Sequence, residues 1–487
     1  MPPKRIRQLY TTVAIPIFTY AADIWFTAIH PSPSGPKRLG SVALTKKLTS
    51  VQRQASRTIT GALRTAAGDV LEANANLLPI DLLFSKILFR AATRLASLPP
   101  SHPLHQPVHK AAKRFVKKHR SALHNIFHFT VIVPSSIETI SPVCRRPNYK
   151  PKFTTHIAAD KERALTRATT LHNTTYTVYS DGSGFENGIG AAAVMYINQV
   201  ESQSLWAHLG PSTKHTVYEG ELTGLCLALH ILSSLPFTIR SRIIIGTDSQ
   251  AAIKALSNQR PHPAHYLLDH IHTLAEKLHT KCNEDSDIQI HWTPGHRDFA
   301  PNERADVLAK RAAEGLSSAN NRLPHFLRNT SLPSSIPAAR QEHLTRLRRI
   351  WKARWKKSPR YTLSHSIDKT LPSNKFLQLV DKLPRSHSAI LTQLRTGHAP
   401  LNHHLFRIRC SETPVCPHCG NLTVETVGHY LLQCPHYQQE RHVLRRKLKR
   451  SANSLSFLLS NSSASKPLIK YIKATNRFPI LNLNANK

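Results

Sequence analysis

Strand and helix patterns alternate between residues 173 and 315, and this alternation constrains the fold more than any other feature of the chain. The first strand, rich in β-branched and aromatic residues, ends in the turn sequence Asp-Gly-Ser-Gly. The expected order is strands at 176–181, 189–197 and 203–209, a helix at 215–235, a strand at 242–247, helices at 249–257 and 264–280, a strand at 288–292 and a helix at 302–313. We therefore expect an α/β fold, with flanking helices on a mixed five-stranded sheet.

Four acidic residues lie at informative positions in this segment. Asp181 and Asp248 end two of the strands, while Glu221 and Asp306 lie in helices. Strand ends beside a helix face can bring such side chains together at one edge of the sheet. Alternatively, each Asp only caps a turn or helix. Glu219, two residues before Glu221, is expected to be a solvated helix acid.

Several short motifs follow one another in the order of a known family. They are Asp181-Gly182-Ser183, Thr216 with Glu221-Leu222, Thr247-Asp248-Ser249-Gln250, and Gly295-His296 followed by Asn302-Glu303-Arg304-Ala305-Asp306. Together they resemble type 1 ribonuclease H. The resemblance implies the ribonuclease H fold over residues 173–315 and hydrolysis of the RNA strand of RNA–DNA hybrids. By this resemblance Asp181, Glu221, Asp248 and Asp306 hold two Mg²⁺ ions, with Mn²⁺ as the alternative, and His296 assists catalysis from a mobile loop. Ser183 and Gln250 are expected to contact nucleic acid. Mg²⁺ prefers oxygen ligands, and two such ions activate water and stabilise the leaving oxygen in phosphodiester hydrolysis.

Two departures from the family pattern affect the expected substrate contacts. Val217 and Tyr218 stand where many relatives have asparagines that contact the hybrid. Residues 251–282 hold only four basic residues, where some relatives carry a basic protrusion. We therefore expect residues 173–315 alone to bind hybrid weakly.

The net charge of +38 is distributed unevenly along the chain. Residues 176–314 hold 15 acidic and 11 basic residues, a net charge of −4, so the remainder carries +42. Such basicity disfavours a metabolic enzyme without a polyanionic partner and predicts that the flanks bind RNA, DNA or the hybrid.

A basic helix is expected over residues 338–357, with Trp351 and Trp355 in its apolar stripe. Arg346, Arg349 and Lys352 lie around that stripe. Tryptophan and arginine can stack on bases or bind phosphates, so these five residues are candidate nucleic-acid contacts. The alternative is a helix whose tryptophans pack inward while its basic face is solvated.

Cys416, Cys419, His429 and Cys434 have the spacing Cys-x2-Cys-x9-His-x4-Cys. Zn²⁺ takes four thiolate or imidazole ligands in a tetrahedron, so we expect a structural zinc site. Any helix that contains His429 should end near Cys434, because Pro435 follows. The alternative is a chance cluster of free thiols. Seven cysteines in 487 residues do not indicate a disulfide scaffold, and a reducing compartment, nuclear or cytoplasmic, is expected.

The flanks resemble non-LTR (LINE-like) retrotransposon polyproteins. Residues 391–398 and the zinc segment with Glu425-Thr426 resemble their C-terminal end. Residues 9–20, Trp25, 51–53, 59–62 and 64–65 resemble the thumb of their reverse transcriptase. The expected domains are a thumb-like remnant (1–104), a basic linker (105–172), the ribonuclease H domain (173–315), a basic helical region (316–405), a zinc knuckle (406–440) and a basic, partly disordered tail (441–487).

No Tyr-x-Asp-Asp motif occurs, so no reverse transcriptase activity is expected, and a separate reverse transcriptase is a candidate partner. The apolar stretch 9–29 contains Pro16 and Asp23 and is expected to be a buried helix, with no membrane partner. Two rival functions stay open. One is a catalytically silent nucleic-acid-binding remnant. The other is an integrase-like nuclease on the same fold, against which the helix-borne Glu221 and the Asn302–Asp306 motif argue.

Overall fold

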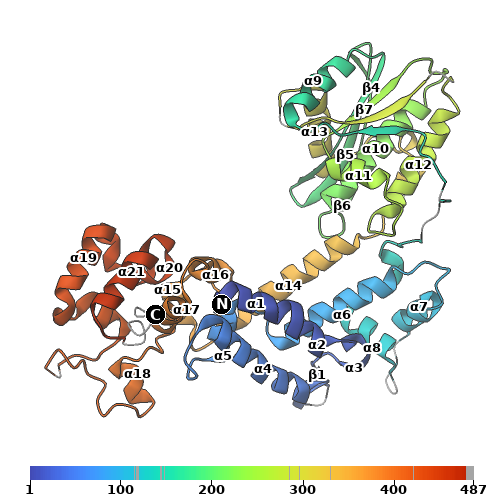
Figure 1. Ribbon diagram of the computed structural model, residues 1–487. Coiled ribbons are helices and arrows are strands. Elements are labelled where there is room, and N and C mark those ends of the chain that lie inside the picture. The colour runs from blue at the N-terminus through green and yellow to red at the C-terminus, as the bar shows by residue number, and fades with distance from the viewer. Residues whose placement is uncertain are drawn as a thin grey trace. The chain divides into compact units, whose positions relative to one another are not determined.

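The computed structural model describes residues 1–33, 35–114, 116, 120–142, 145–146, 148–283, 286–295, 297–328, 331–420 and 422–478. The chain forms two compact units. Unit 1 consists of Met1–Ile87 and Arg346–Lys487, and unit 2 of Leu88–Thr345 (Figure 1). None of the helices in these described ranges combines the length and the apolar character that crossing a bilayer requires.

Unit 2 contains a six-stranded mixed sheet with the order β3-β8-β7-β4-β5-β6. The strands are β3 Thr154–His156, β4 Tyr176–Phe185, β5 Gly188–Ile197, β6 Val200–Pro211, β7 Ile243–Thr247 and β8 Ile288–Trp292. β4, β5 and β6 are antiparallel neighbours, whereas β3, β8, β7 and β4 run parallel. The predicted α/β fold is confirmed, but the sheet has six strands rather than five. The extra strand β3 lies in the expected linker, and its three residues are too few to produce a recognisable period.

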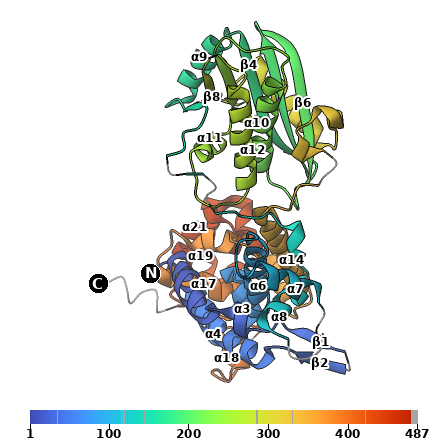
Figure 2. The same cartoon turned by 90° about the vertical axis from the view of Figure 1, so that its right-hand side faces the viewer.

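Helices cover both faces of this sheet, because alternate strand residues point to opposite sides. Val178 and Met195 pack against α10 Val217–Ser233, α11 Gln250–Leu256 and α12 His265–His279. Tyr179 and Val194 pack on the other face against α9 Lys161–Leu171 and α13 Ala300–Ala313. Figure 2 shows α10, α11 and α12 on the near face. Unit 2 also contains α7 His105–Lys113 and α8 Ala122–Thr130, while α6 Ile80–Ala96 and α14 Ile336–Lys356 contribute to both units.

Unit 1 joins two parts of the chain that are distant in sequence. The first part holds α1 Pro3–Leu9, the π-helix η1 Tyr10–Ala14, α2 Ile15–Thr19, α3 Ala22–Trp25, the hairpin β1 His30–Ser32 and β2 Gly35–Leu39, α4 Val42–Thr60 and α5 Gly68–Ala75. The second holds α15 Tyr361–Ile367, α16 Lys375–Val380, α17 Arg385–Thr396, α18 Asn402–Arg407, η5 His429–Gln433, α19 Gln438–Leu448, α20 Leu455–Ser460 and α21 Ser462–Ala474. The Thr392 hydroxyl donates to the Thr60 carbonyl at 2.7 Å, which ties α17 to the end of α4.

Two expectations about the flanks need correction. The stretch 9–29 is not one buried helix, because Val13 and Ile17 are 52% and 73% exposed while Tyr10 is buried. The tail 441–487 was expected to be partly disordered, but its residues up to Ala474 lie mostly in helices whose Leu459 and Leu468 are buried. Residues 479–487 of this tail lie outside the described residues. Two polar side chains of this tail act as helix N-caps. Ser454 and Asn461 accept hydrogen bonds from the first-turn backbone of α20 and α21.

Candidate functional site

Glycine brings helix α10 into direct contact with strand β4. A Cβ added at Gly182 would overlap the backbone nitrogen of Glu221, and one at Gly224 would press against the backbone of Asp181. The helix and strand can therefore approach closely only because these positions carry no side chain. This approach places Asp181 and Glu221 beside each other.

The register of the parallel strands β4 and β7 positions the third carboxylate, Asp248. Ser180 of β4 pairs with Thr247 of β7, so Asp181 and Asp248 both follow the last paired residues. The prediction that Asp181 ends its strand is wrong, since β4 continues to Phe185 along β5. Asp181, Glu221 and Asp248 each offer an oxygen, and these oxygens all lie within 4.8 Å of one another. The sequence patterns grouped four acids, and the structure brings three of them, Asp181, Glu221 and Asp248, within this distance.

Burial and mutual repulsion make this cluster costly without a cation. Asp181 and Glu221 are only 5% and 9% exposed. Burial, together with the charges of Asp181 and Asp248, raises the pKa of Glu221 to about 10. Burial, together with Asp248 and Asp306, raises the pKa of Asp181 to about 7. The buried Oε2 of Glu221 has no hydrogen-bond partner. An oxygen-only donor set with an unsatisfied carboxylate oxygen fits Mg²⁺ or Mn²⁺.

Asp306 approaches the cluster but is held by a residue that the sequence patterns did not indicate. It lies on α13, where its Oδ2 accepts from Lys310 Nζ at 2.5 Å, one helical turn away. Its charge still raises the pKa of Asp181, and Lys310 acts in the opposite direction. The i,i+4 spacing of an acid and a lysine on one helix was the signal available for this pair.

Glu219 is not the solvated helix acid that we expected. It is fully buried and closes a capping box at the start of α10. Its Oε2 accepts from the Thr216 backbone at 2.7 Å, and its own backbone N–H donates to the Thr216 hydroxyl at 3.3 Å. Glu219 therefore fixes where α10 begins, which positions Glu221 half a turn later.

The remaining predicted contacts of this site have mixed outcomes. Ser183 lies two residues beyond Asp181 on β4, and Gln250 is the first residue of α11, two residues beyond Asp248; both are partly exposed. His296 lies outside the described residues. A Cβ at the preceding residue, Gly295, would overlap the Asp248 carboxylate, so this loop backbone approaches the cluster.

On α14, the tryptophans are not available to nucleic acid. Trp351 packs with Leu82 and Leu347, and Trp355 packs with Val70 and Leu371. The prediction that they stack on bases is therefore wrong, because an apolar stripe on this helix serves the core. Arg346, Arg349 and Lys352 are exposed, as the alternative of a solvated basic face predicted.

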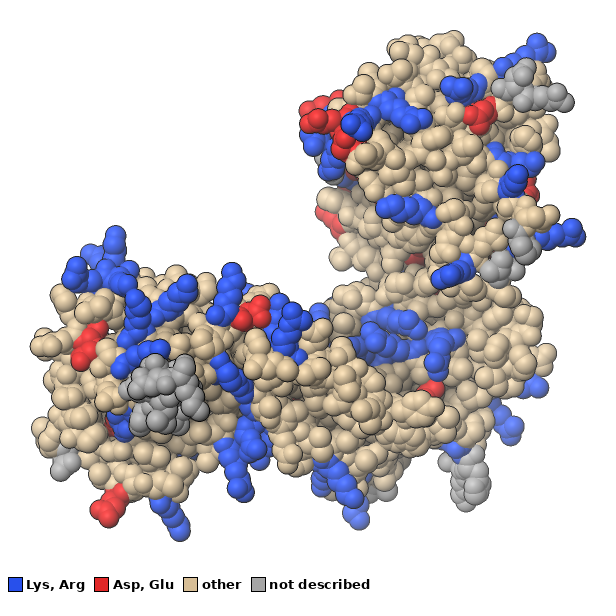
Figure 3. Space-filling model, viewed as in Figure 1, with Lys and Arg blue, Asp and Glu red and all other residues tan. Residues whose placement is uncertain are grey.

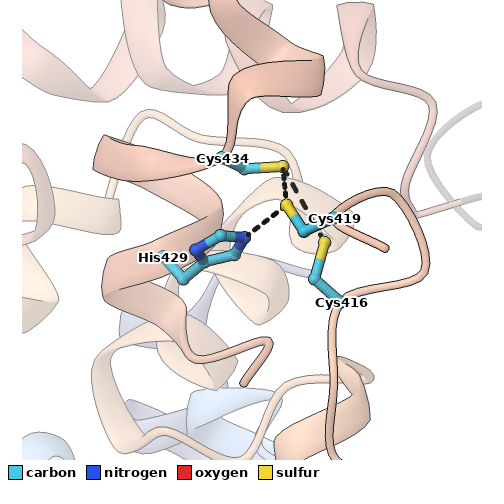
Figure 4. Close-up of side chains that lie close together, drawn as sticks. All are labelled: Cys416, Cys419, His429 and Cys434. Carbon is cyan, nitrogen blue, oxygen red and sulfur yellow. Dashed lines mark hydrogen bonds between the residues drawn. The ribbon is translucent and has the colours of Figure 1, made fainter. Parts of the chain in front are cut away.

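A second cluster lies in unit 1, where Cys416, Cys419, His429 and Cys434 bring their ligand atoms within 4.8 Å of one another (Figure 4). Cys434 Sγ lies 3.8 Å from the Sγ atoms of Cys416 and Cys419, and Cys419 Sγ lies 3.4 Å from His429 Nε2. A tetrahedron with Zn–S near 2.3 Å has S···S edges of about 3.8 Å and S···N edges of about 3.5 Å. These residues fit zinc.

The backbone around this cluster matches the expected helix end. His429 begins η5, which ends at Gln433, so the helix stops just before Cys434 and Pro435. Burial and neighbouring thiols raise the pKa of Cys416 to about 12, and a cation would reverse this shift. Three other potential ligands nearby in the sequence, Cys410, His418 and His436, are not in this cluster. Cys410 is exposed, and His418 stacks on His436.

Comparisons with known proteins concern the segment that holds the carboxylates. Residues 173–314 match the family model of RNase H, so an RNase H domain lies in this part of the chain. No curated protein matches the chain.

The chain is also similar to solved structures. RNase H1 from the halophilic archaeon Halobacterium salinarum NRC-1 is 24% identical, with 29% of this chain and 98% of that chain covered and a TM-score of 0.23. The N-terminal RNase H domain of rv2228c from Mycobacterium tuberculosis is 21% identical, with 28% and 98% covered and a TM-score of 0.23. LC11-RNase H1, solved in complex with RNA/DNA hybrid, is 17% identical, with 29% and 97% covered and a TM-score of 0.23.

Proposed function

We propose that the chain is a metal-dependent endonuclease that hydrolyses the RNA strand of RNA–DNA hybrids and that derives from a non-LTR retrotransposon. The observation that carries this proposal is the convergence of Asp181, Glu221 and Asp248 inside a segment that matches RNase H. An unpaired buried oxygen on Glu221 supports a cation in that cluster.

Asp181, Glu221 and Asp248 would hold the cations, and Asp306 would join them from α13. Two bound Mg²⁺ ions, or Mn²⁺, supply an activated water and stabilise the leaving oxygen. Asp181 is held in a buried position, and Glu219 fixes the start of α10, the helix that carries Glu221. Lys310 would position Asp306. Ser183 and Gln250 are proposed to contact the nucleic acid, and His296 is proposed as a proton carrier near neutral pH.

The basic flanks are proposed to supply most of the affinity for nucleic acid. Arg348, Lys352 and Lys356 recur at every fourth position of α14 and are exposed. Lysines and arginines also project from the part of unit 1 where α19 and α21 lie (Figure 3). Their binding would release counterions from phosphates and would depend strongly on salt.

Replacing Arg348, Lys352 and Lys356 by Ala should weaken hybrid binding without changing the cleavage rate at saturating hybrid. The slope of log K against log salt should fall by about 0.9 for each phosphate that the variant no longer neutralises, as fluorescence anisotropy at several salt concentrations would measure. The matched control exchanges Arg348 for Lys and both lysines for Arg, which keeps the charge and should keep the affinity. Unchanged binding in the alanine variant would show that this face of α14 does not bind the hybrid.

The zinc cluster is proposed to be structural, because its four protein ligands would leave no open position for chemistry. A separate reverse transcriptase is proposed as a partner, because the flanks resemble parts of non-LTR retrotransposon polyproteins.

The competing proposal is a silent nucleic-acid-binding remnant, which the departures at Val217 and Tyr218 favour. The test offers the full chain with Mg²⁺ a panel of labelled substrates: RNA–DNA hybrid, RNA duplex, DNA duplex and single-stranded RNA. Cleavage of RNA only within the hybrid is expected. Binding of the hybrid without any cleavage would favour the remnant.

A further inference from the structure

A small polar cluster in unit 1 joins a loop and a helix that are far apart in sequence. Thr65 lies in the loop between α4 and α5, His398 follows α17, and His404 lies on α18. The Thr65 hydroxyl oxygen lies 3.0 Å from His398 Nδ1 and 3.1 Å from His404 Nε2. The two imidazole rings are 4.6 Å apart. One hydroxyl therefore bridges two histidines.

The hydrogen bonds of this cluster leave the ring N–H of His398 as the donor that faces outward. His404 is 2% exposed, and its Nδ1 has no hydrogen-bond partner. An unpaired acceptor is less costly than an unpaired buried N–H, so the proton of His404 belongs on Nε2, which donates to Thr65. The Thr65 hydroxyl then donates to His398 Nδ1. This order leaves the proton of neutral His398 on Nε2, where the ring is half-exposed.

The charged groups around these histidines are cationic. Burial lowers the pKa of His398 to about 4, and His404, Arg407 and Arg360 act in the same direction. Burial also lowers the pKa of His404, as do Arg407 and His403. Arg360 and Arg407 are exposed, and so is Thr65. Among the described residues, no acidic group shifts the pKa of either histidine, so the cluster offers donors and positive charge to an anion.

We propose that Thr65, His398, His404, Arg360 and Arg407 form a phosphate-binding site that holds a backbone phosphodiester of a nucleic-acid strand. Guanidinium groups and N–H donors bind phosphate oxygens through short, charge-assisted hydrogen bonds. A polyanion is the ligand favoured here because the chain carries a net charge of +38. The site lies in unit 1, whereas the carboxylates lie in unit 2, so it goes beyond the proposed cleavage of hybrids.

The test measures binding of a 3′-labelled, 5′-hydroxyl single-stranded RNA to the full chain by fluorescence anisotropy, without added Mg²⁺. The double variant Arg360→Ala with Arg407→Ala should bind about tenfold more weakly or worse, since a hydrogen bond to a charged group disappears at each position. The salt slope should fall by about 0.7 for the phosphate that is released. Thr65→Val keeps the charge and should also weaken binding, because it breaks the bridge between the histidines.

The matched control is Lys46→Ala with Lys47→Ala, which removes the same charge from the exposed first half of α4. Lys46 lies about 21 Å along the helix from Thr60, at a rise of 1.5 Å per residue. An equal loss of affinity in this control would overturn the site, because the effect would then reflect net charge alone. Normal binding by Thr65→Val would overturn it as well.

A second arm uses the same RNA with a 5′-phosphate. Equal effects of the variants on both RNAs are expected, whereas effects confined to the 5′-phosphorylated RNA would contradict a phosphodiester site. Circular dichroism should match wild type for the Arg360/Arg407 variant. Because the binding arm needs no cleavage, its failure is distinguishable from failure of the proposed nuclease function.

Discussion

Replacing Asp181 by Asn should lower the rate of hybrid cleavage by about 10³-fold, which corresponds to about 4 kcal/mol less transition-state stabilisation. Asp181 is the most buried member of the carboxylate cluster and shares it with Glu221 and Asp248. The amide keeps the shape of the side chain but removes the charge that would hold a cation. Single-turnover cleavage of a labelled hybrid with Mg²⁺ measures the effect.

The same substitution should stabilise the metal-free protein. The pKa of Asp181 is raised from its ordinary value of 3.8 to about 7, so the folded state disfavours its charged form. The contribution of Asp181 to the free energy of unfolding is therefore most favourable below about pH 4 and is lost as the pH rises toward 7. Thermal melts of the wild type should show this decline, and Asp181→Asn should flatten it. Added Mg²⁺ should stabilise the wild type more than the variant at neutral pH.

The control for both readouts is Glu186→Gln, an isosteric loss of one charge in the exposed turn after β4. It should cleave hybrid at the wild-type rate and melt with the wild-type pH profile. An Asp181→Asn protein that cleaves as fast as this control would show that the cluster does not perform the chemistry.

Replacing Cys434 by Ala should remove bound zinc and destabilise unit 1 by several kcal/mol. Zinc-ligand binding free energy is folding free energy in small metal-bound modules, about 10–16 kcal/mol in peptides. Cys434 and Cys416 are buried in one core with Tyr430, Leu431 and Leu459, so loss of the metal also disturbs apolar packing. The zinc content of the purified chain should fall by one ion per molecule in metal analysis. The midpoint temperature for unfolding of unit 1 should decrease.

Cys410→Ala is the matched control, because Cys410 is an exposed cysteine outside the cluster. It should retain zinc and melt normally. Equal zinc content in the Cys434→Ala and Cys410→Ala proteins would show that Cys416, Cys419 and Cys434 are free thiols and not zinc ligands.

The sheet and three of its acids could be predicted from the sequence because their signals are local. Strand periodicity and a strand end at Asp248 are each visible within a few residues, whereas the turn expected after Asp181 is part of β4. Family spacing distinguishes Glu221 from Glu219, and the structure gives the reason: Glu219 closes the capping box while Glu221 faces the other carboxylates. The Lys310–Asp306 pair was not predicted, although its i,i+4 spacing is visible in the sequence.

Other features depend on contacts that no local pattern contains. Strand β3 exists because Thr154 and His156 pair with β8, more than 130 residues later. The burial of Trp355 depends on Val70, from the other end of the chain. Unit 1 likewise forms only when Met1–Ile87 meets Arg346–Lys487, as the Thr392 to Thr60 hydrogen bond illustrates.

The most direct test of the central claim is cleavage of an RNA–DNA hybrid, labelled on each strand in turn, by the full chain with Mg²⁺. Wild-type protein and Asp248→Asn protein are purified and assayed in parallel. We expect the wild type to fragment the RNA and leave the DNA intact, and the variant to bind the hybrid without cutting it. Intact RNA with the wild type, or equal fragmentation by both proteins, would contradict the assignment of hydrolysis to this carboxylate cluster.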